Sequence, residues 1–405
     1  MTSTRFQECC RTLLKFQRRN LHSSVNLRVG TFGRPNKSIL SELGFSKYYK
    51  IRSNIGLLIQ DFSKKPVPSV SYDFLTTYKK LHLNSNEQYT LTIKTINYLL
   101  SFTCRQLNSI QRLPYIVILN PKVEESYSLY MKTLKSLLSV RYPYDLYQKD
   151  KMIALFTEFL NDHNDTLLTL SNGLREITDY YPRESVFQFL NDHLQNRITM
   201  KLLVTHYLNL ITHDTSDSRH IGIIEKDLSV SKLIKHCWDF VGDLCYIKYD
   251  INSLKMTIND GKDVTFSCIP LVLEYITTEI LKNSSRAQIE SEQLEKPIEV
   301  SIYKYDDDEL TIKIRDYGGG IPPDVEDKIF DYSYSTNDFD DSLNANEEAM
   351  NPGEQFNNVA GMGFGLPLSK AYLELFGGKL EIQSLYGLGT DVYIKVKGPG
   401  NDSFE

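Results

Sequence analysis

Three polar side chains at helical spacing could perform chemistry in the segment after Pro270. Glu279, Asn283 and Arg286 follow one another at intervals of four and three residues, so a helix places them on one face. The amide oxygen of Asn283 is a hard ligand that suits Mg²⁺, and a carboxylate one turn earlier can orient or deprotonate a nucleophile. Taken alone, the pattern fits a solvated helix face better than a site.

A second candidate element follows the segment 310–314, whose alternating apolar residues predict a strand. Asp316 stands at the end of this strand, and glycines occupy positions 318–320. The glycines let the backbone approach a flat ligand, while the carboxylate accepts a hydrogen bond from it, as the amino group of adenine would offer. An isolated motif of this kind is equally well explained as a turn.

Glycines alternate again from Gly361 to Gly365, just before a segment with a helical pattern. Backbone N–H groups at a helix start, together with the positive end of the helix dipole, form a cradle for phosphate. A dinucleotide-binding interpretation fails because that fingerprint must follow a strand directly. The turn 387–389 then leads into the last predicted strand, where Thr390 can reach the edge of an adenine ring.

The segment 337–360 is polar and contains acidic residues but no Lys or Arg. Loops of this length inside a compact domain are usually lids or disordered inserts. Its position directly before the glycines of the phosphate cradle favours an ATP lid.

In this order and spacing, the elements resemble the GHKL ATPase superfamily, and more closely its mitochondrial dehydrogenase kinases, with the nearest likeness among fungal pyruvate dehydrogenase kinases. The family motifs E-L-x-K-N-A-x-R-A, Y-x-Y-S-T, G-x-G-x-G-L-P-[IL]-S and G-x-G-T-D are similar to residues 279–287, 332–336, 361–369 and 387–391. Its motifs H-N-D, R-I-S and H-I-G-x-I resemble residues 163–165, 197–199 and 220–224.

The resemblance implies both a fold and a site. The fold is an N-terminal domain like a four-helix bundle, followed by a GHKL (Bergerat-type) α/β sandwich that binds ATP. Glu279 would be the general base toward a substrate serine, Asn283 the Mg²⁺ ligand and Asp316 the adenine-binding residue. The other nucleotide-binding residues would be Arg286, Gly318, Gly320, Ser335, Thr336, Gly361, Gly363, Phe364, Gly365, Leu366 and Thr390.

Three features depart from the family pattern. Tyr275 stands four residues before Glu279, where the family has a histidine. The predicted lid is longer and more acidic than the family's, which is electrostatically unfavourable near a triphosphate unless the lid stays mobile or contacts another subunit. The tail 398–405 lacks the Asp-Trp element with which some pyruvate dehydrogenase kinases cross their dimer, which weakens the choice of a pyruvate over a branched-chain substrate.

The elements that must position these residues follow from hydrophobic periodicity. From about residue 38 to residue 209, apolar residues recur at helical spacing and predict four or so long helices in a bundle. Alternation with period two predicts strands in the later part, at residues 298–302, 310–314, 380–382 and 392–396. Strands with helices on one face make an α/β sandwich.

A cluster of Ser, Thr and Asp at Thr215–Asp217 indicates the boundary between the two parts. The predicted organisation is therefore a helical domain over 31–215, an ATPase domain over 216–400 and a tail over 401–405. Residues 1–30 hold six basic side chains and a single acid, Glu8, which is typical of a mitochondrial transit peptide. A basic disordered tail is the alternative.

Composition excludes several classes of protein. With 405 residues, 41% of them hydrophobic and 24% charged, the chain can form two ordinary globular domains. No apolar run is long enough to span a membrane, and a net charge of −5 argues against nucleic acid as a partner. The six cysteines lack the spacing of a zinc site.

From the family resemblance we predict a mitochondrial matrix serine kinase that uses Mg²⁺ and ATP to phosphorylate and inactivate the α subunit of the first component of the pyruvate dehydrogenase complex. The resemblance further implies docking onto lipoyl domains of the acyltransferase core, and a homo- or heterodimer formed through the ATPase domain. Alternatives are a branched-chain 2-oxoacid dehydrogenase kinase, a non-catalytic partner of a paralogous kinase, and a histidine kinase. His163 and His220 are interpreted as structural hydrogen-bond partners rather than phosphate acceptors.

Overall fold

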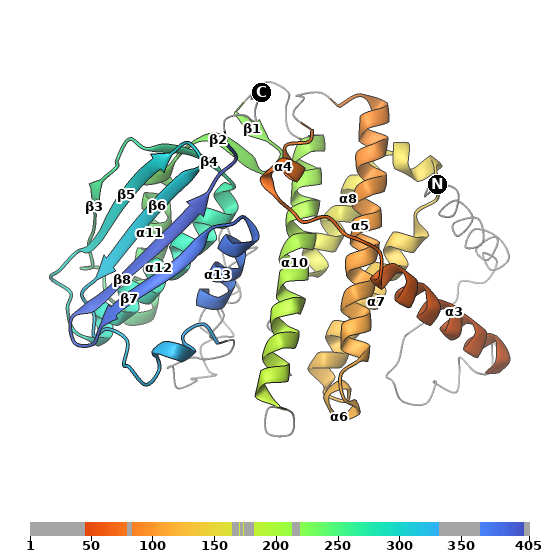
Figure 1. Cartoon of the computed structure of the whole chain (residues 1–405), viewed down its shortest axis with the longest axis horizontal. Coiled ribbons are helices and arrows are strands. Elements are labelled where there is room, and N and C mark those ends of the chain that lie inside the picture. Colours follow the sequence, from red (N-terminus) through yellow and green to blue (C-terminus); the bar gives the residue numbers. More distant parts are fainter. Residues whose placement is uncertain are drawn as a thin grey trace.

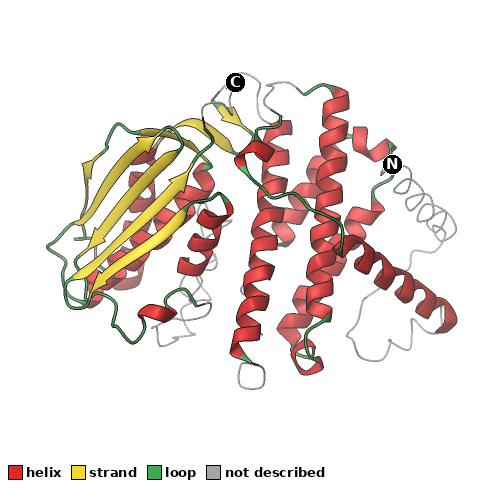
Figure 2. Cartoon of the chain, in the orientation of Figure 1, coloured by secondary structure: helices red, strands yellow, loops and turns green. Residues whose placement is uncertain are grey.

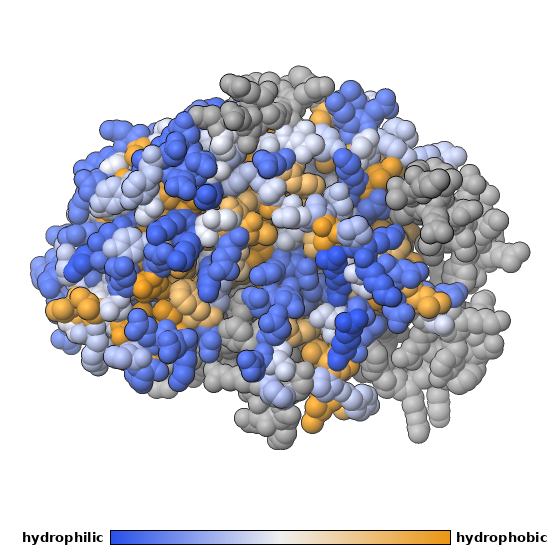
Figure 3. All heavy atoms as spheres, viewed as in Figure 1, coloured by the Kyte–Doolittle hydropathy of each residue, from blue (hydrophilic) through white to orange (hydrophobic). Residues whose placement is uncertain are grey.

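A computed structural model of the chain describes residues 45–78, 83–163, 170, 173, 182–212, 219–331 and 365–400. Within these ranges a half made of helices lies beside a half built on a sheet (Figures 1 and 2). None of the described helices is long and apolar enough to cross a membrane. Hydrophilic residues cover most of the face seen in Figure 3.

The helical half is a bundle in which α5 is central, because it packs against α3, α7 and α10. A capping box starts α5: Asn84 accepts a hydrogen bond from the N–H of Glu87, and the Glu87 carboxylate accepts one from the N–H of Asn84. The long helices are α3 (Phe45–Ser63), α5 (Ser85–Gln111), α7 (Pro121–Ser139), α8 (Lys149–Asp162) and α10 (Arg183–Thr212). Shorter ones are α4 (Tyr72–Leu75), α6 (Tyr115–Ile118) and the 3₁₀ helix η1 (Tyr144–Tyr147).

The periodic apolar residues that predicted these helices form the core of the bundle. In α10, Leu190, Leu194, Ile198 and Leu202 are all buried, as one stripe of a helix facing its neighbours requires. The predicted helical bundle is therefore confirmed for the described residues.

The other half contains a five-stranded sheet in the order β3-β5-β6-β8-β7. Its parallel pair is β3 with β5, and the remaining neighbours are antiparallel. The strands are β3 (Met256–Asp260), β5 (Ile298–Asp306), β6 (Glu309–Asp316), β7 (Lys379–Leu385) and β8 (Gly389–Lys397). The four strands expected from alternation are confirmed as β5, β6, β7 and β8, whereas β3 was not anticipated.

Helices cover one face of this sheet, as the sandwich prediction required (Figure 1). They are α11 (Val230–Tyr249), α12 (Pro270–Glu290) and α13 (Gly365–Leu375). Val300, Ile312, Ile314 and Ile394 point to the helices and are buried. A short 3₁₀ helix, η2 (Glu326–Lys328), follows β6.

A small second sheet, β1 (His220–Ile221), β2 (Ile224–Ser229) and β4 (Thr265–Cys268), joins the two halves and was also not anticipated. The imidazole of His206 in α10 accepts a hydrogen bond from the N–H of Ile223 at 3.4 Å. Gly222 has φ +57°, and a Cβ there would lie 2.2 Å from Nδ1 of His206. Only glycine therefore fits at position 222, beside His206. The predicted boundary at Thr215–Asp217 lies outside the described residues.

Candidate active site and nucleotide pocket

Helix α12 carries three of the candidate residues, of which Glu279 is buried and Asn283 is accessible. Pro270 occupies the first turn of the helix, as expected from the sequence. Glu279 is only 3% exposed, whereas Asn283, one turn later, is exposed. The helix thus places a carboxylate in the protein interior and a hard oxygen donor at the surface beside it. Asn283 fits a Mg²⁺ ion that takes few protein ligands and keeps water and phosphate oxygens as the others.

One oxygen of the Glu279 carboxylate has a hydrogen-bond partner, and the other lies close to the start of α13. Lys282 donates to Oε1 at 3.0 Å. Oε2 faces the first residue of α13, Gly365, where an added Cβ would lie only 2.4 Å away. The structure therefore brings Gly365 to Glu279, and it adds Lys282, to which the sequence analysis gave no role although the spacing of three residues was visible.

Tyr275 lies one turn before Glu279 and is 3% exposed. Burial first, and then the negative charge of Glu279, raise the pKa of Tyr275 well above its usual value. The phenol therefore remains protonated at physiological pH. Its ring contacts that of Tyr372 in α13, with centroids 5.5 Å apart.

Asp316 lies at the end of β6, as predicted, and is 4% exposed. Its Oδ1 accepts a hydrogen bond from the N–H of Gly318 at 3.0 Å. Burial raises the pKa of Asp316, while hydrogen bonds from Gly318, Ser284 and Thr390 oppose that increase. A carboxylate with these neighbours can accept one more hydrogen bond from a ligand.

Thr390 is brought to Asp316 by the sheet, because the two residues are cross-strand partners of β6 and β8. The hydroxyl of Thr390 lies 3.1 Å from that of Ser384 in β7. Ser384 also accepts a hydrogen bond from the N–H of Ile321, at 2.7 Å, and so ties the loop after the glycines to the sheet. Ser384 has no motif around it that marks it in the sequence.

Two glycines of the pocket are explained by close contacts. A Cβ on Gly318 would lie 2.7 Å from that of Ala287 in α12, so glycine lets the strand end approach the helix. Gly320 has φ +68° and would direct a side chain into the carbonyl of Leu385 at 2.5 Å. These glycines thus let the chain after Asp316 lie close to α12 and to the end of β7.

The remaining candidates divide into described and undescribed residues. Arg286 forms an ion pair with Glu290 along α12, with Nε 2.5 Å from Oε1. Leu366 is half-buried in the first turn of α13. Ser335, Thr336, Gly361, Gly363 and Phe364, like the predicted lid 337–360, lie outside the described residues. Within the described ranges, no cluster of three or more His, Cys, Asp or Glu residues could hold a metal ion.

The histidines have the surroundings expected of structural residues. Nε2 of His163 lies 2.7 Å from the hydroxyl of Thr133, and its carbonyl accepts a hydrogen bond from Arg197. Burial, before the charge of Arg197, lowers the pKa of His163 well below its usual value. His220 lies 3.6 Å from Glu225.

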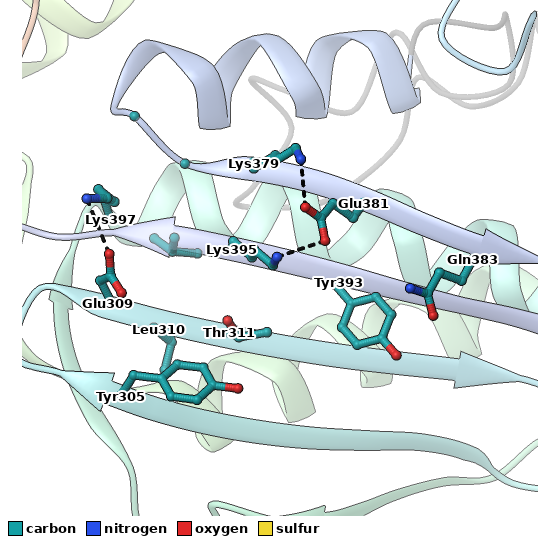
Figure 4. Close-up of a pocket in the computed structure, with 13 residues that line it drawn as sticks. Tyr305, Glu309, Leu310, Thr311, Lys379, Glu381, Gln383, Tyr393, Lys395 and Lys397 are labelled. Carbon is teal, nitrogen blue, oxygen red and sulfur yellow. Dashed lines mark ion pairs between the residues drawn. The ribbon is translucent and has the colours of Figure 1, made fainter. Parts of the chain in front are cut away.

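A separate hollow of about 580 Å³ lies on the face of the sheet that the helices leave uncovered (Figure 4). Glu381 bridges Lys379 at 2.7 Å and Lys395 at 2.8 Å, and Glu309 pairs with Lys397 at 3.3 Å. Glu279 and Asp316 do not line this hollow, so it is distinct from the candidate site that contains them.

Comparison with known proteins agrees with this geometry. Residues 69–225 match the family model described as mitochondrial branched-chain alpha-ketoacid dehydrogenase kinase. Residues 269–399 match the model of histidine kinase-, DNA gyrase B- and HSP90-like ATPases. The second match spans Glu279, Asn283, Asp316 and Thr390, so all of these residues belong to an ATP-binding domain.

Full-length relatives identify the family more narrowly. The chain is 52% identical to [pyruvate dehydrogenase (acetyl-transferring)] kinase 1, mitochondrial, of Saccharomyces cerevisiae over 370 residues, which cover 90% of this chain and 93% of the relative. It is 28% identical to isozyme 3 of the mouse and human kinases over 335 residues, 78% of this chain and 78% and 79% of the relatives. The similarity to the yeast kinase thus extends along almost the whole chain. This chain therefore belongs to the family of mitochondrial pyruvate dehydrogenase kinases.

Proposed function

We propose that this protein is a serine kinase that uses Mg²⁺ and ATP to phosphorylate the α subunit of the first component of the pyruvate dehydrogenase complex, and thereby inactivates it. One observation carries the proposal: a buried carboxylate, Glu279, lies one turn from the accessible Asn283 on the same helix, against the start of α13. A base, a metal ligand and a phosphate-binding helix start are the parts that transfer of a phosphoryl group to a hydroxyl needs.

Asp316 would select the nucleotide. Its carboxylate accepts a hydrogen bond from the adenine amino group, and Thr390 lies beside it on the neighbouring strand. A buried site that holds such a polar group rejects analogues that lack the partner, because its own groups would then be left without a hydrogen bond. Guanine offers a carbonyl at that position and is therefore disfavoured.

Glu279 would act on the substrate. It accepts the proton of the serine hydroxyl while the serine oxygen bonds to the γ-phosphorus and the bond to ADP breaks, so the proton ends on the carboxylate and the phosphoryl group on serine. Asn283 would hold Mg²⁺, which neutralises charge on the phosphates. Lys282 orients the carboxylate, since it donates to Oε1 at 3.0 Å.

The choice of the pyruvate complex rests on the relatives. The protein that is 52% identical across 90% of this chain is named a pyruvate dehydrogenase kinase, while the branched-chain description comes from a family model of the helical half. A branched-chain 2-oxoacid dehydrogenase kinase is the second candidate.

The partners and location are also proposed. The dimer contact of the ATPase domain is proposed to form on the uncovered face of the sheet (Figure 4). This face carries the paired Lys and Glu side chains of the hollow, together with Tyr305 and Tyr393. The helical domain, residues 31–215, would dock on the lipoyl domains of the acyltransferase core. Residues 1–30 would direct the chain to the mitochondrial matrix, as supported by their basic composition and by the mitochondrial names of the relatives.

The deciding experiment is incubation of the purified chain with γ-labelled ATP and either the pyruvate or the branched-chain dehydrogenase. We expect acid-stable label on the α subunit of the pyruvate enzyme, loss of its activity, and no label with Glu279→Gln. Label only on the branched-chain enzyme would favour the second candidate. Acid-labile label on the chain itself would indicate a histidine kinase, and no label on either enzyme would indicate a non-catalytic partner.

A further inference from the structure

Three polar side chains form one row at the end of the large sheet. Asp316 in β6 is the cross-strand partner of Thr390 in β8, and Thr390 is in turn the partner of Ser384 in β7. Directly opposite residues of paired strands place their side chains on the same face of a sheet. The next residues of β8 on this face, Val392 and Ile394, are buried, so the row lies on the face that the helices cover.

Ser384 forms hydrogen bonds on two sides. Its Oγ accepts one from the N–H of Ile321 at 2.7 Å, and it lies 3.1 Å from Oγ1 of Thr390. The single hydroxyl proton of Ser384 has two acceptors within reach, which are this Oγ1 and the carbonyl of Gly389 at 3.4 Å. Because the shorter separation gives the stronger hydrogen bond, Ser384 donates to Thr390.

The direction of this hydrogen bond decides what Thr390 can offer to a ligand. A threonine hydroxyl carries one proton and two lone pairs. Since its oxygen accepts the proton of Ser384, its own proton remains for another acceptor. The neighbouring carboxylate of Asp316 can only accept while it is ionised. The row therefore presents a hydrogen-bond donor beside an acceptor.

A donor beside an acceptor matches one edge of adenine. This base has an amino group, which donates, next to the ring nitrogen N1, which accepts. Guanine has a carbonyl and an N1–H at the same two positions, so both of its groups would oppose those of the row. A buried site discriminates strongly when the wrong ligand leaves its polar groups without partners.

The loop after Asp316 does not depend on Ser384 alone. The N–H of Gly387, at the tip of the β7–β8 hairpin, donates to the carbonyl of Gly319 at 2.7 Å. Loss of the serine hydroxyl therefore leaves the loop attached to the hairpin, while it removes the donor to Thr390.

We propose that Ser384 is a positioning residue for nucleotide selection. By donating to Thr390, it leaves the threonine hydroxyl to donate to N1 of adenine, beside the amino group that Asp316 accepts. The inference rests on the proposed function in taking ATP as the nucleotide, but not in the transfer of phosphate. It adds β7, on which the sequence predicted no site residue, to the selection of the base.

Calorimetric titration of the full chain with Mg²⁺ and three nucleotides tests this role. ATP carries both the amino group and N1, purine riboside triphosphate keeps only N1 of the two, and 1-deaza-ATP keeps only the amino group. Ser384→Ala is expected to weaken binding of the first two by about three- to tenfold, the range for one hydrogen bond. Its affinity for 1-deaza-ATP stays unchanged. An equal loss with all three nucleotides would show that Ser384 only holds the loop, and would overturn the proposal.

Further variants test whether Ser384 acts through Thr390. In the Thr390→Val background, which removes the hydroxyl but keeps the branched shape, Ser384→Ala causes no further loss of ATP affinity. Ser384→Thr retains a hydroxyl and restores the affinity of the wild type. Ser301→Ala, at a half-buried serine of β5, is the matched control without effect. Additive losses in the double variant would contradict the proposal.

The binding measurements also separate this inference from the proposed kinase function. Binding of ATP without phosphate transfer would contradict the kinase activity, while the three affinities would still decide the role of Ser384. A wild-type chain that binds ATP and 1-deaza-ATP equally tightly would overturn the inference even if it transferred phosphate. A chain that binds no ATP would overturn both.

Discussion

Lys282 and Glu279 form a largely buried ion pair on α12, with Nζ 3.0 Å from Oε1 and side chains 20% and 4% exposed. The lysine therefore sets the position of the carboxylate before any substrate arrives. Lys282→Met removes this donor, and we expect kcat to fall about tenfold, a modest part of what general-base catalysis contributes. Lys282→Arg, which keeps the positive charge, is the control. Steady-state kinetics with ATP and the dehydrogenase measures both, and an unchanged kcat in the methionine variant would exclude the positioning role.

Substitutions of Glu279 and of Asp316 are expected to impair different steps of the reaction. Glu279→Gln keeps the shape of the helix, so nucleotide binding remains while phosphate transfer falls by about 10² to 10⁴, the usual contribution of a general base. Asp316→Asn can no longer accept the adenine hydrogen bond in the same way and loses ATP binding. Titration calorimetry with Mg²⁺ and ATP, paired with a transfer assay, separates the two effects. Equal loss of affinity in both variants would refute this division of roles.

Gly365 cannot gain a side chain without disturbing the carboxylate of Glu279, because a Cβ there would lie 2.4 Å from its Oε2. Gly365→Ala is therefore expected to reduce kcat strongly while the fold is retained. Gly56→Ala in α3, where a Cβ meets nothing within 4 Å, is a matched control. Thermal unfolding and transfer rates for the two variants check the prediction, which fails if both alanine variants are equally active.

Asp145 provides a pH-dependent contribution to stability in the bundle. Burial would raise the pKa of this fully buried carboxyl, but Lys151 at 2.8 Å and the N–H of Arg141 at 2.8 Å outweigh it, so the folded-state pKa lies below the unfolded value. The stabilisation is thus present above the unfolded pKa and is lost as pH falls through the folded one. Asp145→Asn is expected to lower the free energy of unfolding by about 1 to 3 kcal/mol near neutral pH.

Denaturant unfolding of wild type and Asp145→Asn at neutral and acidic pH measures this contribution. The difference between the two proteins should shrink as the pH approaches the acidic range where the carboxyl takes up a proton. A constant difference at all pH values would show that the charge of Asp145 is not its cause.

Sequence reasoning located the parts of the site that depend on local pattern. The helix after Pro270, the strand ending at Asp316 and the turn before Thr390 all follow from periodicity, proline and glycine, and all are confirmed. The contact of Gly365 with Glu279 was not predicted, because it arises from the packing of two helices distant in the sequence. Contacts of this kind depend on tertiary packing rather than on spacing along the chain.

The strands that the sequence did not predict were missed for a similar physical reason. Strand β3 and the small sheet of β1, β2 and β4 are short and interrupted by irregular register, so alternation is too brief to predict them. Gly222 could not be explained from its neighbours, since it is His206, from the preceding helix, that excludes a side chain there.

The pairing of Asp316 with Thr390 on adjacent strands has a consequence for ligand discrimination. The register of two paired strands can change only by whole residues. A shift of one residue would turn Thr390 toward the opposite face of the sheet. The proposed preference for adenine over other purines should therefore persist undiminished on heating and vanish abruptly, together with the cooperative melting of the strands.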